Sequence, residues 1–272
     1  MSESERRMHT LFAVGHMAIA YLLGKGSSKP LRVKFNIPIL LVLSILPDVD
    51  IIFDYLTNSQ IHRGPTHSIV VATLAFIPFF IIYRKRAIPY FLALISHPLI
   101  GDFFIGGRLQ LFWPLSTNEY GLHELGSYYI GIFNPVNIAL ELTLFVIATF
   151  VLFKSGDWKI FLKSNKTNLV LIFPIATVLL PSTIGYPFSN SLLLSEPLLA
   201  LAHLFYLVLF SVAVLKTLIP FFKKDSFLNR KRFNLFSSSA ILLSSLLLVL
   251  LRWKQGFFKQ YLYQKYFIQH SN

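Results

Sequence analysis

Long, mostly apolar segments recur along this chain and constrain its fold more than any other feature. Each approaches the roughly 20 residues that a helix needs to cross the hydrocarbon core of a bilayer. Because lipid cannot satisfy backbone N–H and C=O groups, a spanning helix must satisfy them internally. We therefore predict an all-α, polytopic transmembrane helical bundle of about eight spans. The segments are 9–23, 36–56, 67–83, 87–106, 131–153, 168–184, 197–219 and 235–252.

The composition excludes other classes of protein. Hydrophobic residues make up 54% of the 272 residues and charged residues 14%, whereas a soluble domain has about 25% charged residues. The net charge of +13 could indicate nucleic-acid binding, but the basic residues stand in short loops between apolar segments. Membrane topology explains that placement better, so we expect membrane lipid as a partner and no nucleic acid. The chain has no cysteine, which excludes thiolate metal ligands.

The lysines and arginines also orient the predicted bundle. If the eight segments alternate in direction, most of these residues fall on one side, in clusters such as 84–86 and 230–232. Short loops rich in Lys and Arg stay in the cytoplasm, which places both termini outside. The basic, aromatic tail 252–267 fits this poorly, and we interpret it as an amphipathic segment on a membrane surface. Segment 9–23 has the length of a signal peptide, but no A-x-A cleavage site follows it.

One stretch concentrates ionisable side chains that the apolar segments otherwise lack. Residues 46–68 carry three aspartates and two histidines between almost wholly apolar flanks. Such groups are costly to bury in a membrane unless they pair, reach water or bind a metal. Pro47 and the Gly64–Pro65 pair interrupt helices here, which would let the acids and the imidazoles converge. The ionisable residues of this stretch are Asp48, Asp50, Asp54, His62 and His67.

Other ionisable residues belong to the same membrane level in this topology. His16 lies in the outer part of the first segment, and His97 and Asp102 lie in the outer half of the fourth. Imidazole and carboxylate ligands suit divalent ions such as Zn or Mn. We predict a site for one or two such ions on the extracytoplasmic side of the cell membrane. Its metal ligands would be His16, Asp48, Asp50, His62, His67, His97 and Asp102.

The same residues offer the parts of a hydrolytic site. A metal-bound water is acidified to a hydroxide nucleophile near neutral pH, and a carboxylate left over from metal binding can act as base. Arg63 offers a planar guanidinium for an anion, and free N–H groups of a helix starting at Pro65 or Thr66 could cradle a phosphate. We predict catalytic roles for Asp48, Asp50 and Arg63. The substrate would be a phosphoester or related ester of a lipid-type molecule near the outer leaflet.

Five motifs follow one another within residues 12–116: GHMAIAYLLG, LPDVD, HRGPTHS, SHPLIGD and FWP. Their order resembles that of the YdjM-like family of membrane-bound, metal-dependent hydrolases. The resemblance implies a hydrolase of the inner membrane, and Arg63 matches the motif arginine. The positions that match the family's ligands are His16, Asp48, Asp50, His62, His67, His97 and Asp102.

One spacing departs from the family pattern. The last aspartate usually follows its histidine by four residues, whereas Asp102 follows His97 by five, with Pro98 between them. On a straight α-helix this turns the carboxylate about 140° away from the histidine. A π-bulge or a turn adjusted by the proline could bring it back.

Several polar residues leave alternatives open. Asp54 could pair with Arg63 instead of binding metal. Asn137 and Glu141 share a face of segment 131–153 and favour interhelical hydrogen bonds, although Glu141 could instead contribute to the site. His203 stands alone in its segment, and we interpret it as structural.

Two other functions use the same residues. A metal or small-solute transporter would need a polar path through the cytoplasmic half of the bundle, and the sequence offers no ionisable residues there. A membrane scaffold would keep the motifs for stability alone. For the enzyme, we predict a metal-site-bearing half at residues 1–120 and an accessory half at residues 121–272.

Overall fold

The computed structural model describes residues 12–51, 62–105, 108–122, 132–185 and 191–225, with the side chains of 221–225 left out. The chain divides into two units, residues 1–220 and 221–272. Most of the second unit lies outside the described residues, and all five sequence motifs belong to the first. Within the described ranges the regular structure is helical, apart from one isolated antiparallel bridge between Leu109 and Tyr120. The all-α prediction is confirmed, and the division at residue 120 stays a prediction.

The first part of the chain forms short helices with interruptions at the motif residues. A seven-residue helix follows the long first helix, and two further helices make a hairpin around the basic turn 84–87. Two 3-10 turns, Leu46–Asp48 and Pro65–His67, lie between the seven-residue helix and the hairpin. The hairpin ends in a π-helical turn, His97–Asp102. The helices are α1 (Ala13–Leu31), α2 (Ile37–Leu43), α4 (Ile69–Tyr83) and α5 (Ile88–Ser96).

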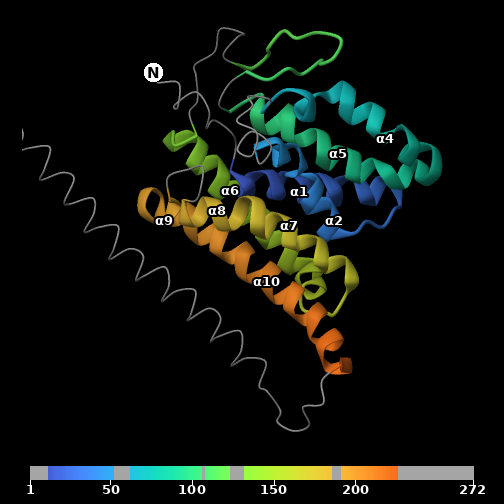
Figure 1. Ribbon diagram of the computed structural model, residues 1–272, viewed down its shortest axis with the longest axis vertical. Helices are drawn as coiled ribbons and strands as arrows, with labels where there is room; N and C mark the ends of the chain where they lie inside the picture. Colours follow the sequence, from blue (N-terminus) through green and yellow to red (C-terminus); the bar gives the residue numbers. More distant parts are fainter. Residues whose placement is uncertain (1–11, 52–61, 106–107, 123–131, 186–190, 226–272) are drawn as a thin grey trace, which may run out of the picture. The chain divides into compact units, whose positions relative to one another are not determined.

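The second part contains the longer apolar helices (Figure 1). Asn134 caps the first of them by accepting a hydrogen bond from the Val136 amide, as short polar side chains do at helix starts. A mixed helical segment at 166–184 includes a π-helical turn, Ile175–Leu179. The helices are α6 (Pro135–Lys154), α7 (Ile172–Pro174), α8 (Leu180–Ile184), α9 (Leu192–Ser195) and α10 (Pro197–Asp225).

Helix α1 is the centre of the packing in the first unit. It lies against α5, α6 and α2. Val14, Met17, Ala18 and Ala20 have no exposed surface, so this helix is buried on all sides over its first turns. A helix that is apolar all round is typical of such a central position. Any polar side chain on these turns is held among other helices.

Three described helical segments are long and apolar enough to cross a membrane: 135–154, 166–184 and 197–220. They correspond to three predicted spans. The prediction of about eight spans is not supported, and the predicted span 235–252 lies outside the described residues.

The other predicted spans fail for two physical reasons. Those at 36–56, 67–83 and 87–106 are broken by proline and by the motif turns, so that α4, with 15 residues, is only about 22 Å long. Helix α1 has 19 residues, but its second half is polar, with Lys25, Lys29 and two serines. Short helices of this kind do not reach across about 30 Å of hydrocarbon by themselves.

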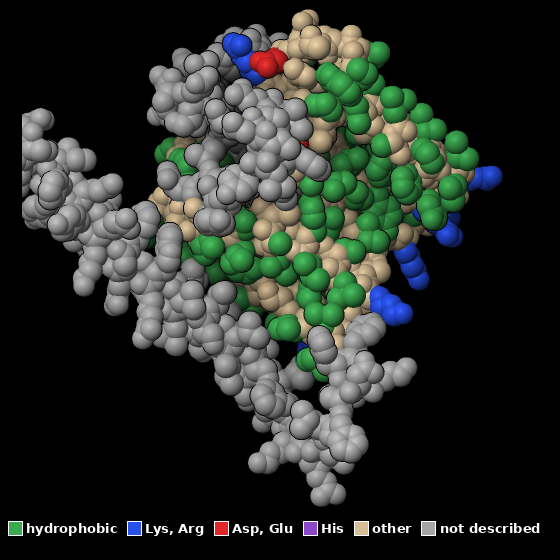
Figure 2. All heavy atoms as spheres, in the orientation of Figure 1, with side chains coloured by type: hydrophobic (Ala, Val, Ile, Leu, Met, Phe, Trp, Pro, Cys, Tyr) green, Lys and Arg blue, Asp and Glu red, His purple; other side chains and the backbone are tan. Residues whose placement is uncertain are grey.

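Helix α4 nevertheless exposes an apolar surface. Hydrophobic side chains spread over this part of the molecule (Figure 2), and Leu74, Ile81 and Ile82 are 57%, 72% and 69% exposed. Exposed apolar patches of this kind mark contact with lipid or with another protein. The surface suits a protein embedded in lipid.

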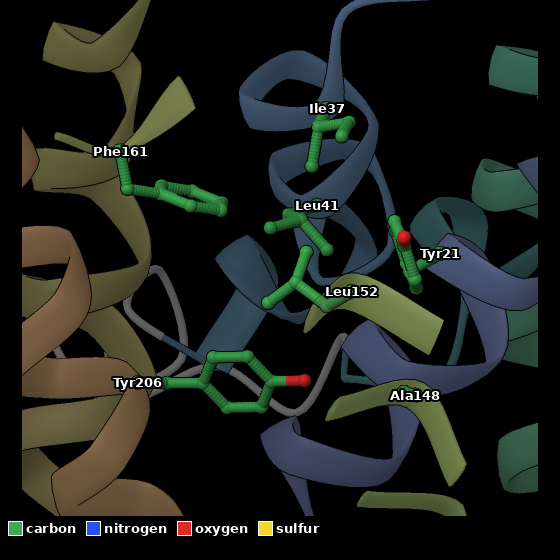
Figure 3. Close-up of a pocket in the computed structure, with 7 residues that line it drawn as sticks. All are labelled: Tyr21, Ile37, Leu41, Ala148, Leu152, Phe161 and Tyr206. Carbon is green, nitrogen blue, oxygen red and sulfur yellow. The ribbon is translucent and has the colours of Figure 1, made fainter. Parts of the chain in front are cut away.

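One small hollow lies between α1, α2, α6 and α10 (Figure 3). Its wall is apolar except for two tyrosines, and the Tyr206 side chain points into it. None of the predicted site residues lines it, so it is separate from the predicted metal site. The lining residues are Tyr21, Ile37, Leu41, Ala148, Leu152, Phe161 and Tyr206.

Candidate metal centre

Four separate elements bring the predicted ligands together. His16 comes from the first turn of α1, Asp48 from the 3-10 turn after α2, His67 from the turn before α4, and His97 with Asp102 from the π-helical turn. All five are at most 8% exposed. Residues far apart in the sequence thus form one buried cluster, as the prediction of a common site requires.

His97 is held at one ring nitrogen and faces the cluster with the other. Its Nδ1 donates a hydrogen bond of 2.7 Å to the carbonyl oxygen of Ser44. Its Nε2 lies 3.2 Å from Asp48 Oδ1 and 3.4 Å from Asp102 Oδ2. Histidines that bind metals characteristically donate from one nitrogen to a protein oxygen and leave the other for the ion.

His67 repeats this arrangement. Its Nδ1 lies 3.0 Å from Thr66 Oγ1 and 3.3 Å from Asp50 Oδ2. Its Nε2 points to the opposite side, 3.0 Å from Asp102 Oδ2 and 3.6 Å from Asp48 Oδ1. Two imidazoles therefore direct one nitrogen each at the same pair of carboxylates.

His16 reaches the cluster from a different direction. Its ring stacks on that of His97, with 3.8 Å between centroids and 14° between planes, and its Nε2 lies 3.8 Å from Asp102 Oδ1. Gly101 makes room for it, because a Cβ at that position would come within 2.1 Å of His16 Cε1. Neither ring nitrogen of His16 has a hydrogen-bond partner within the described ranges.

The carboxylate of Asp50 organises the HRGPTHS motif. It accepts hydrogen bonds from His62 Nδ1 at 2.7 Å, from the Arg63 amide at 3.2 Å and from the Thr66 hydroxyl. Arg63 has the left-handed backbone conformation, with φ of 67°, which a non-glycine residue adopts at some cost in free energy. That turn lets residues on both sides of Arg63 reach one carboxylate. Asp50 thus orients His62 and His67 instead of facing the cluster with its own oxygens.

The π-helical turn accounts for the unusual spacing of His97 and Asp102. The Phe103 amide donates to the Pro98 carbonyl at 3.1 Å, which is the five-residue hydrogen bond of a π-helix. Widening the turn by one residue brings Asp102 back to the face of His97, where their atoms lie 3.4 Å apart. The expectation that a π-bulge restores this register agrees with the structure.

The buried atoms of the cluster lack donors, and this fits a cation. Because His97 Nδ1 carries a proton toward Ser44, its Nε2 in the neutral ring is an acceptor, and it faces carboxylate oxygens. Acceptors at such distances repel unless a cation or extra protons lie between them. Within the described part of the chain, the atoms without a hydrogen-bond partner include both nitrogens of His16, Asp48 Oδ1, Nε2 of His67 and His97, and both oxygens of Asp102.

Three overlapping groups have their ligand atoms within 4.8 Å of one another. Asp48, His67 and His97 each belong to two groups, so the groups are parts of one cluster. Buried His and Asp residues of this chain could therefore hold one or more metal ions, and the ion's identity is open. The groups are His16, Asp48 and His97; Asp48, His62 and His67; and His67, His97 and Asp102.

The predicted anion cradle at the start of α4 is wrong. The Ile69 amide donates to the Leu111 carbonyl, and the amides of Val70 and Val71 donate to Ser68 Oγ. Ser68 is the N-cap of α4, so the N–H groups that the prediction left for phosphate are used within the protein.

Arg63 also differs from its expected setting. Its Nη2 lies 3.9 Å from Asp102 Oδ1, so its guanidinium faces a member of the cluster. The predicted pairing with Asp54 lies outside the described residues. The predicted catalytic roles of Asp48, Asp50 and Arg63 stay predictions.

The FWP motif lies along the HRGPTHS motif. Ser68 Oγ donates to the carbonyl oxygens of Leu111 and Trp113, and the Gln110 amide donates to the Arg63 carbonyl. The segment that carries FWP thus supports the turn that presents His67. No sequence pattern indicates this role, because it uses backbone atoms.

Sequence reasoning missed three supporting residues: Ser44, Thr66 and Gly101. Ser44 acts through its carbonyl, which any residue possesses, so no signal could have indicated it. Thr66 and Gly101 stand inside the motifs HRGPTHS and SHPLIGD, and a polar and a small residue beside ligands could have suggested their roles.

The family of the chain follows from residues beyond the motifs as well. A family model described as YdjM inner membrane protein matches residues 6–215. The chain belongs to the YdjM inner membrane protein family. The match extends well past residue 116, where the recognised motifs of this YdjM family member end, and it includes α6 and most of α10. No curated protein and no solved structure matches the chain.

Proposed function

We propose that this YdjM family member is a metal-dependent hydrolase of the inner membrane. The observation that carries the proposal is the convergence of acceptor atoms from four elements without donors among the described residues. A divalent cation of the Zn or Mn type, when bound, would polarise an ester and acidify a water molecule. His16, Asp48, His67, His97 and Asp102 are the residues that would hold one or two such ions.

The remaining residues of the site have supporting roles in this proposal. Asp50 keeps the rings of His62 and His67 oriented through its hydrogen bonds to them. The guanidinium of Arg63, near Asp102, adds positive charge where an anionic group of a substrate would approach. Among the ligands, Asp48, 8% exposed, is the most accessible carboxylate, and we propose its oxygen not used for metal binding as general base.

For the substrate we propose a lipid-type phosphoester. Hard-to-borderline divalent cations such as Mn and Zn, together with an arginine, bind phosphate oxygens well. The exposed apolar surface of α4 supports a substrate whose tail stays in lipid while its headgroup reaches the ions. The basic turn 84–87 lies at the opposite end of the α4–α5 hairpin from His67 and His97, and this supports an extracytoplasmic position for the site.

Metal content and hydrolysis test the proposal together. The purified protein in detergent is analysed for bound Zn and Mn and assayed with p-nitrophenyl phosphate and with a long-chain lipid phosphate. The variant His62→Ala/His67→Ala should lose both metal and activity. Equal, substoichiometric metal in wild type and variant would refute the metal site. Bound metal without hydrolysis, together with metal uptake into proteoliposomes, would favour the transporter.

A further inference from the structure

Glu141 is a fully buried carboxylate in α6 that lies outside the three groups of candidate ligands. Its Oε1 accepts a hydrogen bond of 2.5 Å from the Phe12 amide, and the Gly15 amide in turn donates to the Phe12 carbonyl. Phe12 and Gly15 both belong to the start of α1. Glu141 therefore connects a candidate membrane span, residues 135–154, to the first turn of the central helix.

The start of α1 needs such a partner. The first N–H groups of a helix have no acceptor within the helix, and Phe12, at the N-cap position, has no side chain that could cap it. The first turn of α1 also contains no acidic residue. A carboxylate at this end satisfies the free donors and interacts favourably with the helix dipole. Glu141 supplies from α6 the cap that the local sequence of α1 lacks.

His16 depends on this first turn for its position. The His16 amide donates to the Phe12 carbonyl at 3.3 Å, so the residue bound by Glu141 and the candidate ligand belong to one helical turn. The other three imidazoles in the cluster are each fixed by a hydrogen bond at Nδ1, whereas His16 has none within the described ranges. Its ring is placed by the backbone of α1, by stacking on His97 and by the space above Gly101.

We propose that Glu141 is a positioning residue of the metal centre, acting through the first turn of α1 on His16. The proposal rests on the metal binding in the proposed function but not on hydrolysis or on the substrate. It makes α6 part of the site's support, although α6 contributes no candidate ligand among the described residues. Without Glu141, the Phe12 amide at the start of α1 would lose its acceptor, and the first turn would hold His16 over Gly101 less firmly.

Cobalt provides the test, because Co²⁺ absorption in the visible region reports the ligands around the ion as well as the affinity. Three variants of the full chain are titrated with Co²⁺ in detergent: Glu141→Ala, Glu141→Gln and the control Asn168→Ala. Gln keeps an acceptor oxygen for the Phe12 amide. Asn168 is equally buried and donates hydrogen bonds to the Ile160 and Lys163 carbonyls. Asn168→Ala therefore also removes a buried polar group, but one that does not bond to α1.

We expect Glu141→Ala to weaken Co²⁺ binding about 10- to 100-fold, as loss of a group that orients a ligand does, and to change the spectrum. The Co²⁺ affinity of Glu141→Gln should stay within about 3-fold of that of wild type, because glutamine keeps an acceptor oxygen for the Phe12 amide. Asn168→Ala should lower the melting temperature without changing the spectrum. Adding Glu141→Ala to His16→Ala should cost little further affinity, because Glu141 acts on the metal only through His16.

The outcomes separate this proposal from the proposed function. If wild type binds no Co²⁺, both are refuted. If wild type binds Co²⁺ and Glu141→Ala keeps its affinity and spectrum, only the positioning role is refuted. The same holds if Asn168→Ala weakens binding as much as Glu141→Ala, or if the effects of Glu141→Ala and His16→Ala simply add.

Discussion

Helix α1 takes part in two clusters of charged residues, one near each end, and they differ in how their polar atoms are satisfied. Toward the C-terminal end, Lys25 Nζ lies 2.6 Å from Asp157 Oδ2, and the Tyr21 hydroxyl donates to the same oxygen at 2.8 Å. The Tyr21 hydroxyl also lies 3.2 Å from Ser155 Oγ. Donors and acceptors match here, and both charges reach solvent. We call this the Lys25 cluster.

Near the start of α1, the cluster around His16 has the opposite character. Its carboxylates and imidazoles are nearly or fully buried, and acceptor faces acceptor. Buried polar groups are ordinarily paired, so a matched cluster needs no explanation beyond stability, whereas an unmatched one calls for a further partner. The comparison assigns a structural role to the Lys25 cluster and a ligand-binding role to the His16 cluster.

Removing a candidate ligand should have the largest effect. His97→Ala takes away the nitrogen that faces both Asp48 and Asp102, and we expect metal affinity to fall more than about 100-fold, beyond the loss from supporting residues. Element analysis of the purified protein and Co²⁺ titration measure this. His203→Gln, which changes another buried histidine, is the control and should keep the metal. Full metal content in His97→Ala would contradict the ligand-binding role of the His16 cluster and thus its difference from the Lys25 cluster.

Asp50→Asn should weaken metal binding about 10- to 100-fold while leaving the stoichiometry unchanged. The asparagine amide cannot accept at both positions where Asp50 now accepts from His62 and Thr66. Competition with a metal indicator dye measures the affinity. The matched control is Asp157→Asn in the Lys25 cluster, for which the affinity should equal that of wild type. An equal loss in both variants would mean that α1 transmits changes between its ends.

Gly101→Ala should destabilise the protein by about 1–3 kcal/mol, as overpacking does, and displace His16. The new Cβ would lie 2.1 Å from His16 Cε1. Thermal unfolding and Co²⁺ titration should both report the change. Gly26→Ala in the same helix as His16 has nothing within 4 Å and should be neutral or slightly stabilising. Gly101→Ala with wild-type stability and affinity would contradict the close approach of the His16 ring to Gly101.

The Lys25 cluster should show the smallest effect and a pH dependence. Burial raises the pKa of Asp157, but Lys25 and Tyr21 oppose it and the net pKa is lowered. The stabilisation is therefore complete above the unfolded-state pKa of about 3.9 and is lost as pH falls toward the folded-state pKa. Asp157→Asn should cost about 0.5–1 kcal/mol at pH 7.

Melting temperatures in detergent at pH 7 and at about pH 3, below the unfolded-state pKa, measure this difference, which should shrink at the lower pH. Glu119→Gln, in an ion pair with 4.0 Å separation and exposed side chains, serves as the control and should show no change at either pH. A difference for Asp157→Asn that grows on acidification would contradict the lowered pKa.

The sequence alone predicts much of the site because few side chains bind cations. The scarcity of ionisable residues in apolar segments singled out His16, His67, His97 and Asp48, and the structure places them together. It could not separate Asp50, which orients histidines, from Asp48, which faces the cluster, since both are aspartates of one motif. That distinction depends on the turn at Arg63, which no composition or spacing indicates.

The span count failed for a related reason. Hydropathy measures how apolar a segment is but not whether its helix is continuous, and turns at Pro47 and Pro98 interrupt the α-helices of two predicted segments. Uninterrupted segments, such as those of α6 and α10, were predicted to within a few residues. The helices are interrupted at the same places that supply the candidate metal ligands, because a break in a helix lets its side chains converge on the cluster.

Because of the widened turn, His97 and Asp102 lie close together in space although one more residue stands between them than in the family pattern. A search for related proteins that fixes the number of positions between this histidine and this aspartate would pass over the chain, although its side chains meet as closely as the site demands. Searches that compare three-dimensional arrangements of imidazole and carboxylate groups would accept either spacing. An inserted residue, absorbed by a single five-residue hydrogen bond, leaves the chemistry in place.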